Sequence, residues 1–471
     1  MARSVLSHAV NACSSRRANI VTKSVVALIV GAVVLAPGAA HASGLSIARF
    51  GGEHGTPTTT EAPSIYYNPA GIADSEGGHL YGDLSLAFRS ATYTHQSSGT
   101  DAPVPAGAEG ANTGRATLFN VIPEPFVGAT YRFGRFAIGA AVFVPFGGQD
   151  SWNKNGAFQG NNRFPGAVDG VQRWYMIQGE LRSTFISLAG AYSLGKVSIG
   201  VAVNLIDTVA DIVQARNASG SDDIRTEGRA WLDSQSWDAS MGVGIAYQPM
   251  KKLRLGLSYQ SRPNFGGGIR ATGDLHTLFG ASAADSKVAF TTDLPDVVRA
   301  GASYRPTERV ELRLFGDYQR WSVLQHQCIM AASSTCDINP DGSAQPGSQV
   351  ILNYVRDWHD TFGVRGGASY WTSPGVELLA GAGYGSNAVP SSTLEPALLD
   401  MDFVSASLGG VFALFERVHL ATTYTQVFYF SRDTTGQSAH PTFQAPSKSP
   451  DSGGKYTLAL GLLNVNLDVA F

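Results

Sequence analysis

The sequence predicts an all-β protein, a 14-stranded antiparallel transmembrane β-barrel with an N-terminal hatch, or plug, in its lumen. Three observations predict it: apolar and polar residues alternate along many segments, the number of these segments is even, and the connections between them are alternately short and long. The composition agrees, because 44% of the 471 residues are apolar and only 15% are charged. With a net charge of −3 the chain offers no basic stripe to phosphates, so we expect no nucleic-acid partner.

The first 42 residues have the features of a signal peptide. Basic residues precede an apolar run over residues 25–36, and Ala40-His41-Ala42 forms a small-x-small cleavage site. The alternative, a membrane-anchoring helix, needs a longer apolar run to cross a bilayer. We therefore expect export, with a mature chain that begins at Ser43.

Two cysteines remain after cleavage of the signal peptide. Cys328 and Cys336 are eight residues apart in a polar stretch, and an oxidising compartment makes them a disulfide candidate. Two thiols do not by themselves form a good metal site. We expect no metal and no cofactor.

The alternation is plainest at the C-terminus. Over residues 463–471 every second residue is apolar, and Asn464, Asn466 and Asp468 fill alternate positions. A soluble sandwich would point the apolar face to a core, whereas a membrane barrel points it to lipid. Arginines flanked by apolar neighbours within such segments, as at Arg254 and Arg313, suit a wet lumen better than a packed core.

The same alternation predicts fourteen strands, an even number as in single-chain outer-membrane barrels. They span residues 78–95, 114–132, 135–147, 174–193, 196–210, 226–247, 251–270, 285–305, 308–325, 350–371, 374–387, 400–414, 417–431 and 453–471. Tight turns alternate with long polar connections at 96–113, 148–173, 211–225, 271–284, 326–349, 388–399 and 432–452. Such alternation is typical of periplasmic turns and extracellular loops.

Tyrosines recur near the tight turns. They are Tyr131, Tyr192, Tyr247, Tyr304 and Tyr370. Amphipathic rings gather at the membrane–water interface, so this recurrence favours an aromatic girdle over ordinary strand propensity.

Residues 43–77 precede the first strand, lack alternation and carry many turn residues. A fourteen-stranded barrel is too wide for its own side chains to fill, so we expect this segment to fold into the lumen as the hatch, with the barrel over residues 78–471. Asn68-Pro69 would fix a turn, because φ of Pro69 is preset and the Asn68 side chain can cap local amides. Tyr66 and Tyr67 would wedge against the inner wall. A surface turn is the alternative for the Asn-Pro pair.

Six segments in order carry a resemblance to a known family. They are "YYNPAGIA" at 66–73, "VFVPFG" at 142–147, "LRLGLSYQSRP" at 253–263, "DLPDVVRAGASYRPTERVELRLFGDYQRWS" at 293–322, "DWHDTFGVRGGASY" at 357–370 and "GKYTLALGL" at 454–462. Over essentially the whole mature chain, the sequence resembles the FadL family of outer-membrane long-chain fatty-acid transporters, the OmpP1/FadL/TodX type. This family includes relatives that take up aromatic hydrocarbons.

The resemblance implies a Gram-negative outer-membrane barrel whose hatch contains the turn Asn68, Pro69 and Ala70. It also implies that the third strand bends inward and opens the wall sideways, at Val144, Pro145, Phe146 and Gly147. Proline removes a ladder donor and glycine permits a bend, although Pro145 could also simply end the strand. Two departures from the family are "GEHGTPTTTEAPS" at 52–64, in place of small residues and Arg, and a shorter loop at 211–225.

We therefore expect a monomer in outer-membrane lipid that takes up hydrophobic or amphipathic small molecules passively, foremost long-chain fatty acids. Long loops would capture the ligand at Phe164, Trp174, Leu275, Leu278 and Phe279. Hatch rearrangement and lateral exit would follow. The ligand-binding candidates are Leu45, Ile47, Phe50, Tyr66 and Tyr67 for the apolar part, and Arg254, Arg299, Arg313 and Arg365 for a carboxylate. Alternatively, these arginines pair with wall carboxylates such as Glu311 and Asp317.

Three other functions compete with this expectation. One is aromatic-hydrocarbon uptake by the same type of barrel, and another is a general porin for polar solutes. The third is a membrane-embedded hydrolase, which the absence of GxSxG and HExxH motifs disfavours. We expect no enzyme activity.

Overall fold

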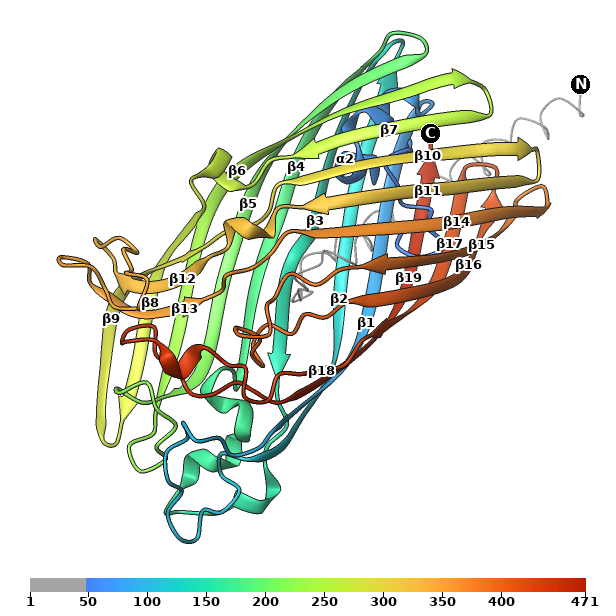
Figure 1. The fold of residues 1–471 in the computed structure, drawn as a ribbon. Helices are drawn as coiled ribbons and strands as arrows, with labels where there is room; N and C mark the ends of the chain where they lie inside the picture. The colour runs from blue at the N-terminus through green and yellow to red at the C-terminus, as the bar shows by residue number, and fades with distance from the viewer. Residues whose placement is uncertain (1–47) are drawn as a thin grey trace, which may run out of the picture.

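The computed structural model describes residues 48–471, which form one antiparallel sheet closed on itself as a barrel (Figure 1). The signal peptide, the start of the predicted hatch, Leu45 and Ile47 lie outside the described residues. The strands are β1 (Gly78–His95), β2 (Gly114–Phe133), β3 (Phe136–Ser151), β4 (Gln178–Ser193), β5 (Val197–Arg216), β6 (Gly228–Met250), β7 (Leu253–Gln260), β8 (Ile269–Phe279), β9 (Ser282–Thr292), β10 (Val297–Thr307), β11 (Val310–Gln319), β12 (His326–Ala331), β13 (Val350–Val355), β14 (Thr361–Ser373), β15 (Val376–Gly385), β16 (Phe403–Phe415), β17 (Val418–Tyr429), β18 (Arg432–Asp433) and β19 (Lys455–Ala470).

Helical segments are short and lie outside the strands. They are α2 (Ser64–Tyr67), η1 (Pro69–Asp74), η2 (Gly156–Phe158), η3 (Pro165–Asp169), η4 (Val171–Trp174), η5 (Pro263–Gly266), η6 (Trp321–Val323) and η7 (His440–Thr442). Within residues 48–471, none of the helices has the length and apolarity needed to cross a bilayer.

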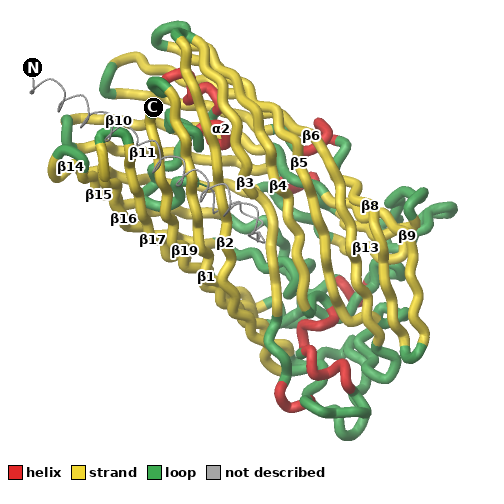
Figure 2. The backbone as a smooth tube through the Cα atoms, turned by 180° about the vertical axis from the view of Figure 1, so that it is seen from behind, coloured by secondary structure: helices red, strands yellow, loops and turns green. Residues whose placement is uncertain are grey.

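The predicted 14-stranded antiparallel barrel is confirmed. β1 pairs with β19 on one side and with β2 on the other, which closes the sheet, as Figure 2 shows from behind. The nineteen labelled strands reduce to fourteen wall positions because four positions hold two strands in succession, and β18 is a two-residue pairing. These four positions are β7 with β8, β9 with β10, β11 with β12, and β13 with β14.

The four interruptions correct the predicted strands 251–270, 285–305, 308–325 and 350–371, which were expected to be continuous. Between β7 and β8, Asn264 and Phe265 have φ of +51° and +53°, which no β-strand accommodates. Pro295 follows β9, and η6 separates β11 from β12. The strands beyond the breaks continue as an outer sheet at the end of the barrel that carries the long connections (Figure 1).

The predicted long loop at 271–284 is wrong. β8 and β9 form a hairpin that turns at Gly280, whose φ is +59°. The polar residues that suggested a loop lie on these strands, where Lys287 Nζ is 2.8 Å from Asp274 Oδ2 on the neighbouring strand. Polar residues on both faces mimic a loop wherever a strand extends past the membrane into water.

Among the strands of residues 48–471, β13 has a neighbour on one side only. It pairs with β12, and its remaining edge meets the connection between β17 and β19. There the Asn353 amide donates to the carbonyl of Pro446 at 3.2 Å, and Asn353 Nδ2 donates to Ser447 Oγ at 2.8 Å. A loop therefore covers this strand edge.

The two faces of the strands have the predicted polarity. On β19, Asn464 and Asn466 are buried inside the barrel, whereas Val465 is exposed outside. Leu188 and Leu408 are 67% and 70% exposed on the outer surface. The five tyrosines near the tight turns are 39–49% exposed, which places them on the outer surface as a girdle requires.

The N-terminal segment, residues 48–77, lies inside the barrel and contacts the wall all around. Asp83 on β1 accepts from the Arg49 amide at 2.9 Å, and Ser407 on β16 accepts from the Gly52 amide at 2.8 Å. Ser258 on β7 donates to the Tyr67 carbonyl at 2.6 Å. These strands are far apart around the barrel, so the segment crosses the lumen.

Three wall glycines make room for the turn that contains Asn68. A Cβ on Gly244 would collide with Asn68 Oδ1, and one on Gly200 would collide with the Pro69–Ala70 peptide. A Cβ on Gly256 would collide with the carbonyl oxygen of Pro57. The inner wall is therefore complementary in shape to this segment at these three glycines. Turn propensities along the sequence cannot reveal such a contact between distant residues.

Candidate ligand site

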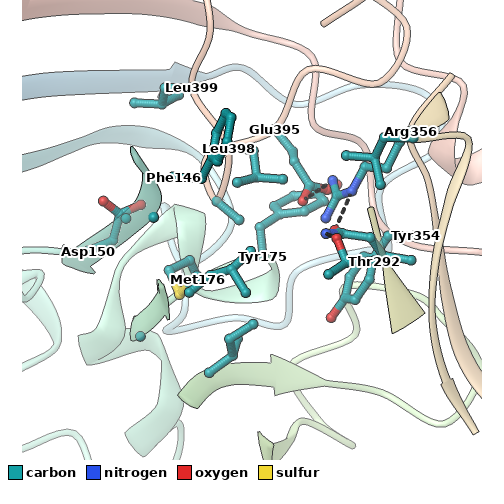
Figure 3. A pocket seen from close by; sticks show the side chains of 18 of the residues that line it. Phe146, Asp150, Tyr175, Met176, Thr292, Tyr354, Arg356, Glu395, Leu398 and Leu399 are labelled. Atoms are coloured by element: carbon teal, nitrogen blue, oxygen red, sulfur yellow. Dashed lines mark hydrogen bonds and ion pairs between the residues drawn. The ribbon is translucent and has the colours of Figure 1, made fainter. Parts of the chain in front are cut away.

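An open cavity, with about 1120 Å³ of empty space including its mouth, lies between the wall and the loops. Figure 3 shows side chains that line it. Its lining comes from β3, β4 and β5 on one side and from the interrupted strands and the 386–402 connection on the other. Most of the lining side chains are apolar, among them Phe146, Met176, Leu181, Ile212, Phe290, Leu294, Trp321, Leu324, Trp358, Leu398 and Leu399. The apolar lining suits a small lipophilic molecule.

Both arginines that line this cavity are paired with carboxylates of the same lining. Arg356 Nη1 donates to Glu395 Oε1 at 2.7 Å, and Arg356 Nε donates to Gln327 Oε1 at 2.7 Å. Arg89 forms an ion pair with Asp150 on the side of β3. Because each arginine is paired with a carboxylate, neither is a free cation that could bind the carboxylate of a ligand.

The Asn68 side chain holds the turn of the N-terminal segment. Its Oδ1 accepts from the Ala70 amide at 3.2 Å, and its Nδ2 donates to the carbonyls of Pro57 and Ile245 at 2.9 and 3.0 Å. The cap that the sequence predicts is thus present, and Pro69 begins η1 directly after it. The bond to Ile245 also fastens the turn to β6.

The described apolar candidates lie below the cavity, in the contact between the N-terminal segment and the wall. Phe50 is buried, and the Tyr67 hydroxyl donates to the carbonyl of Ala48 at 3.1 Å. The Tyr66 ring meets Phe143 of β3 edge-on, with ring centroids 5.5 Å apart. None of these three side chains lines the cavity.

The four candidate arginines are also absent from the cavity lining. Arg313 pairs with Glu311 of the wall at 3.0 Å, which is the alternative that the sequence left open, whereas Arg254 pairs with Asp74 of the N-terminal segment at 2.5 Å. The Arg299 guanidinium lies 4.1 Å from the Tyr66 ring centroid. Arg365 lies between the rings of Phe50 and Phe315, at 5.5 and 5.7 Å. The contacts of Arg254, Arg299 and Arg365 join the wall to the N-terminal segment, and that of Arg313 joins two wall residues.

The wall has an unpaired stretch between β2 and β3, and the cavity reaches it. The ladder between them begins where Phe133 pairs with Phe136 and ends where Phe126 pairs with Phe143. Beyond that point, an isolated bridge joins Leu118 to Trp152. On its other side β3 pairs with β4, with a register shift between Phe143 and Phe146 that leaves Val144 and Pro145 out of the ladder. Phe146 and Gly147, next in the chain, line the cavity.

Two prolines on β2, which sequence reasoning missed, account for the unpaired stretch. The Thr117 carbonyl accepts from the Asn153 amide at 2.9 Å, so the odd-numbered residues of β2 point their backbone groups toward β3. Pro123 and Pro125 have the same parity, and neither has an amide hydrogen to donate. The stretch "VIPEPF" in a strand was the available sign.

The predicted capture residues are mostly inaccessible, which corrects that expectation. Phe164 and Trp174 are buried in a loop cluster with Ala108, and Leu275 on β8 is buried on the inner side. Of the two others, Leu278 is exposed and Phe279 is half-buried. Apolar side chains in these loops stabilise the loops themselves.

The structure joins Cys328 of β12 to Cys336 by a disulfide, with Cα atoms 5.9 Å apart. The bond closes a short loop at the start of the connection to β13. Among residues 48–471, no group of three or more His, Cys, Asp or Glu side chains is arranged to hold a metal ion.

The family model described as "Outer membrane protein transport protein (OMPP1/FadL/TodX)" matches residues 24–449, most of the chain. The chain belongs to this family. It is an outer-membrane protein with a β-barrel fold, and this OMPP1/FadL/TodX member comes from a family of transport channels rather than enzymes.

Outer membrane protein P1 of Haemophilus influenzae is 22% identical to this OMPP1/FadL/TodX member over 439 residues, covering 82% of this chain and 86% of that protein. The crystal structure of a Pseudomonas aeruginosa FadL homologue matches the fold with a TM-score of 0.70 at 13% identity, covering 93% and 99% of the two chains. The Ralstonia pickettii toluene transporter TbuX matches with a TM-score of 0.57 at 15% identity, covering 88% and 97%. The Pseudomonas putida toluene transporter TodX matches with a TM-score of 0.59 at 13% identity, covering 87% and 94%.

Proposed function

We propose that this outer-membrane transport protein takes up long-chain fatty acids or similar lipophiles through the cavity and releases them sideways between β2 and β3. One observation carries the proposal: an apolar cavity of about 1120 Å³ meets a stretch of wall whose strands are not hydrogen-bonded to each other. Burial of a ligand there would contribute about 0.8 kcal/mol per methylene. No energy source is required, since the ligand moves from water to apolar surroundings.

Movement of the N-terminal segment would widen the exit. The Tyr66 ring touches Phe143, the last residue of β3 that pairs with β2, so a shift of the segment reaches the edge of the unpaired stretch. The hatch motif Asn68, Pro69 and Ala70 positions Tyr66 through the turn that it forms. This contact supports a coupling between hatch and side opening.

Aromatic-hydrocarbon uptake is the second candidate. It is favoured by the pairing of Arg89 with Asp150 and of Arg356 with Glu395, which leaves the main cavity without a free cation for a carboxylate. Two of the similar solved structures are toluene transporters by name. An uptake assay with oleate and toluene side by side distinguishes the two candidates.

The proposal predicts that Leu324→Trp, which places an indole ring in the cavity, lowers uptake of the transported compound about tenfold. Leu188→Trp, on the exposed outer face, is the matched control and should leave uptake unchanged. Uptake is measured in cells that lack a fatty-acid transporter of their own. The two variants are compared at equal amounts of folded protein in the outer membrane, which the change in gel mobility on heating reports. Equal uptake by both variants would refute transport through this cavity.

A further inference from the structure

The tight turns at one end of the barrel carry an excess of exposed basic residues. Figure 1 shows these turns at the end opposite the long connections. Four of them follow one another around the wall, the turns β2–β3, β4–β5, β6–β7 and β10–β11, because β7 pairs with β10. Within three residues of these four turns, the exposed charged side chains are one acid, Glu308, and six bases: Arg135, Lys196, Lys251, Lys252, Arg305 and Arg309.

The six basic side chains form no ion pair with any residue between 48 and 471. Two of them donate to backbone carbonyl oxygens instead. Lys252 Nζ donates to Pro306 at 2.7 Å, and Arg305 Nη2 donates to Glu308 at 2.9 Å. The positive charge of these turns is therefore not neutralised within the described part of the chain.

Basic residues nearer the long connections do find carboxylates. Arg262 Nη1 is 3.2 Å from Asp293 Oδ2, and Lys287 Nζ is 2.8 Å from Asp274 Oδ2. Acidic side chains thus accompany basic ones in that part of the wall, and they are scarce at the four turns.

The basic residues of the four turns follow exposed aromatic rings. One such ring precedes the first basic residue of each turn by one to four positions, and the rings are 39–48% exposed; they are Phe133, Tyr192, Tyr247 and Tyr304. Such rings lie at the boundary between hydrocarbon and head groups, and long basic side chains beside them reach the head groups. Because the tight turns of outer-membrane barrels face the periplasm, these are the phospholipid head groups of the periplasmic leaflet.

The distribution of the six basic residues favours lipid as the partner over a folded protein. An acidic protein would cover a single patch, whereas these residues are spread over four successive turns of a curved wall. Lipid molecules surround a barrel and can meet each turn separately. Anionic head groups attract basic residues at a membrane surface, and phosphate oxygens accept hydrogen bonds from guanidinium and ammonium groups.

We propose that the four basic turns bind the head groups of anionic phospholipids in the periplasmic leaflet, such as phosphatidylglycerol. The first of these turns joins β2 to β3, so the bound lipids border the part of the wall that contains the unpaired stretch. This inference goes beyond the proposed uptake function and does not depend on which compound is transported.

The test uses the purified full-length mature protein in vesicles of equal parts phosphatidylcholine and phosphatidylglycerol. Native mass spectrometry after release into detergent counts the lipids of each kind that stay bound. The wild-type protein should retain phosphatidylglycerol about fivefold over phosphatidylcholine at low salt. The preference should disappear at about 1 M NaCl, where the screening length is only about 3 Å.

A variant with four substitutions, Arg135→Gln, Lys196→Gln, Lys251→Gln and Arg309→Gln, should bring the ratio of the two lipids close to one. The matched control removes the same number of exposed positive charges from the other end and should keep the preference; its substitutions are Arg163→Gln, Arg225→Gln, Lys287→Gln and Lys448→Gln. The control therefore separates binding at the four turns from an effect of net charge.

An equal fall of the lipid ratio in both variants would overturn the proposal, and so would a wild-type ratio close to one at low salt. Inorganic phosphate, added in excess before release, should leave the ratio unchanged. A ratio that fell to one with phosphate would assign the turns to a free anion and would also overturn the proposal. If the variant with four substitutions did not fold, the salt dependence of the wild-type ratio would still decide, because a preference that persists in high salt is not electrostatic.

Discussion

Asn68 is buried and Arg216 is half-buried, and the two side chains differ in how completely they are hydrogen-bonded. Asn68 satisfies its amide group through Pro57, Ala70 and Ile245, so its role is fully explained by holding the N-terminal segment. Arg216 donates from Nη2 to the carbonyl of Ile351, while its Nη1 is buried without a partner among the described residues. Buried polar groups in folded proteins are nearly always hydrogen-bonded to protein or to water.

A pH-dependent stability follows from Asp400, in the connection between β15 and β16. Burial raises the pKa of Asp400 to about 6, although the amide of Ala388 donates to it. The folded protein therefore holds the proton more tightly than the unfolded chain does. As pH rises from about 4 to about 6 the unfolded chain loses its proton first, and the free energy of unfolding falls by at most about 3 kcal/mol.

Asp400→Asn should flatten this pH dependence, because an amide does not titrate. Denaturant unfolding of both proteins in liposomes at pH 4, 5, 6 and 7 measures the difference. A wild-type stability that rises over this range relative to Asp400→Asn would contradict the assignment, since the sign is fixed by the raised pKa.

At the scale of strands, prolines decide where the wall is continuous. Pro123 and Pro125 on β2 have no amide hydrogen to donate to β3, and Pro145 lies in the register shift on β3 itself. The interruptions between β7 and β8 and between β9 and β10 likewise contain Pro263 and Pro295. Both kinds of defect border the main cavity, which Gly147 and Leu294 help to line.

Pro123→Val combined with Pro125→Val should restore two amide donors facing β3 and lengthen the ladder. The narrower side opening is expected to lower uptake about tenfold. The comparison is Pro306→Val, which changes a proline near the tight turn between β10 and β11. Hydrogen exchange would report the new protected amides. New protection with undiminished uptake would argue against exit at this place.

The sequence was informative where structure depends on local periodicity. The strand expected at 78–95 is β1 (Gly78–His95), and the alternation along 463–471 gives the correct inner and outer faces. The breaks at Asn264 and Phe265 were missed, because the alternation on either side suggested one strand. The lining of the main cavity could not be predicted for another reason: which arginines already have a carboxylate depends on contacts between connections far apart in the sequence, as for Arg356 after β13 and Glu395 between β15 and β16.

For the whole molecule, the N-terminal segment decides whether the barrel is a channel. Bonds to β1, β6, β7 and β16 hold the segment across the lumen, so the wild-type protein should conduct few ions in planar bilayers. A general porin would conduct freely.

Gly244→Leu should displace the segment, because a side chain there collides with Asn68, and conductance is expected to rise severalfold. Gly190→Leu is the matched control, since a Cβ at Gly190 meets no atom within 4 Å. Single-channel recording measures both variants. A high wild-type conductance, equal in all three proteins, would mean that the segment does not seal the lumen.

The covered edge of β13 affects how the protein meets its neighbours in a crowded membrane. An uncovered strand at the cell surface would be a template onto which a neighbouring protein could add its own strand and start an aggregate. With Pro446 and Ser447 occupying that edge, the outer sheet can extend into water without recruiting strands from other molecules.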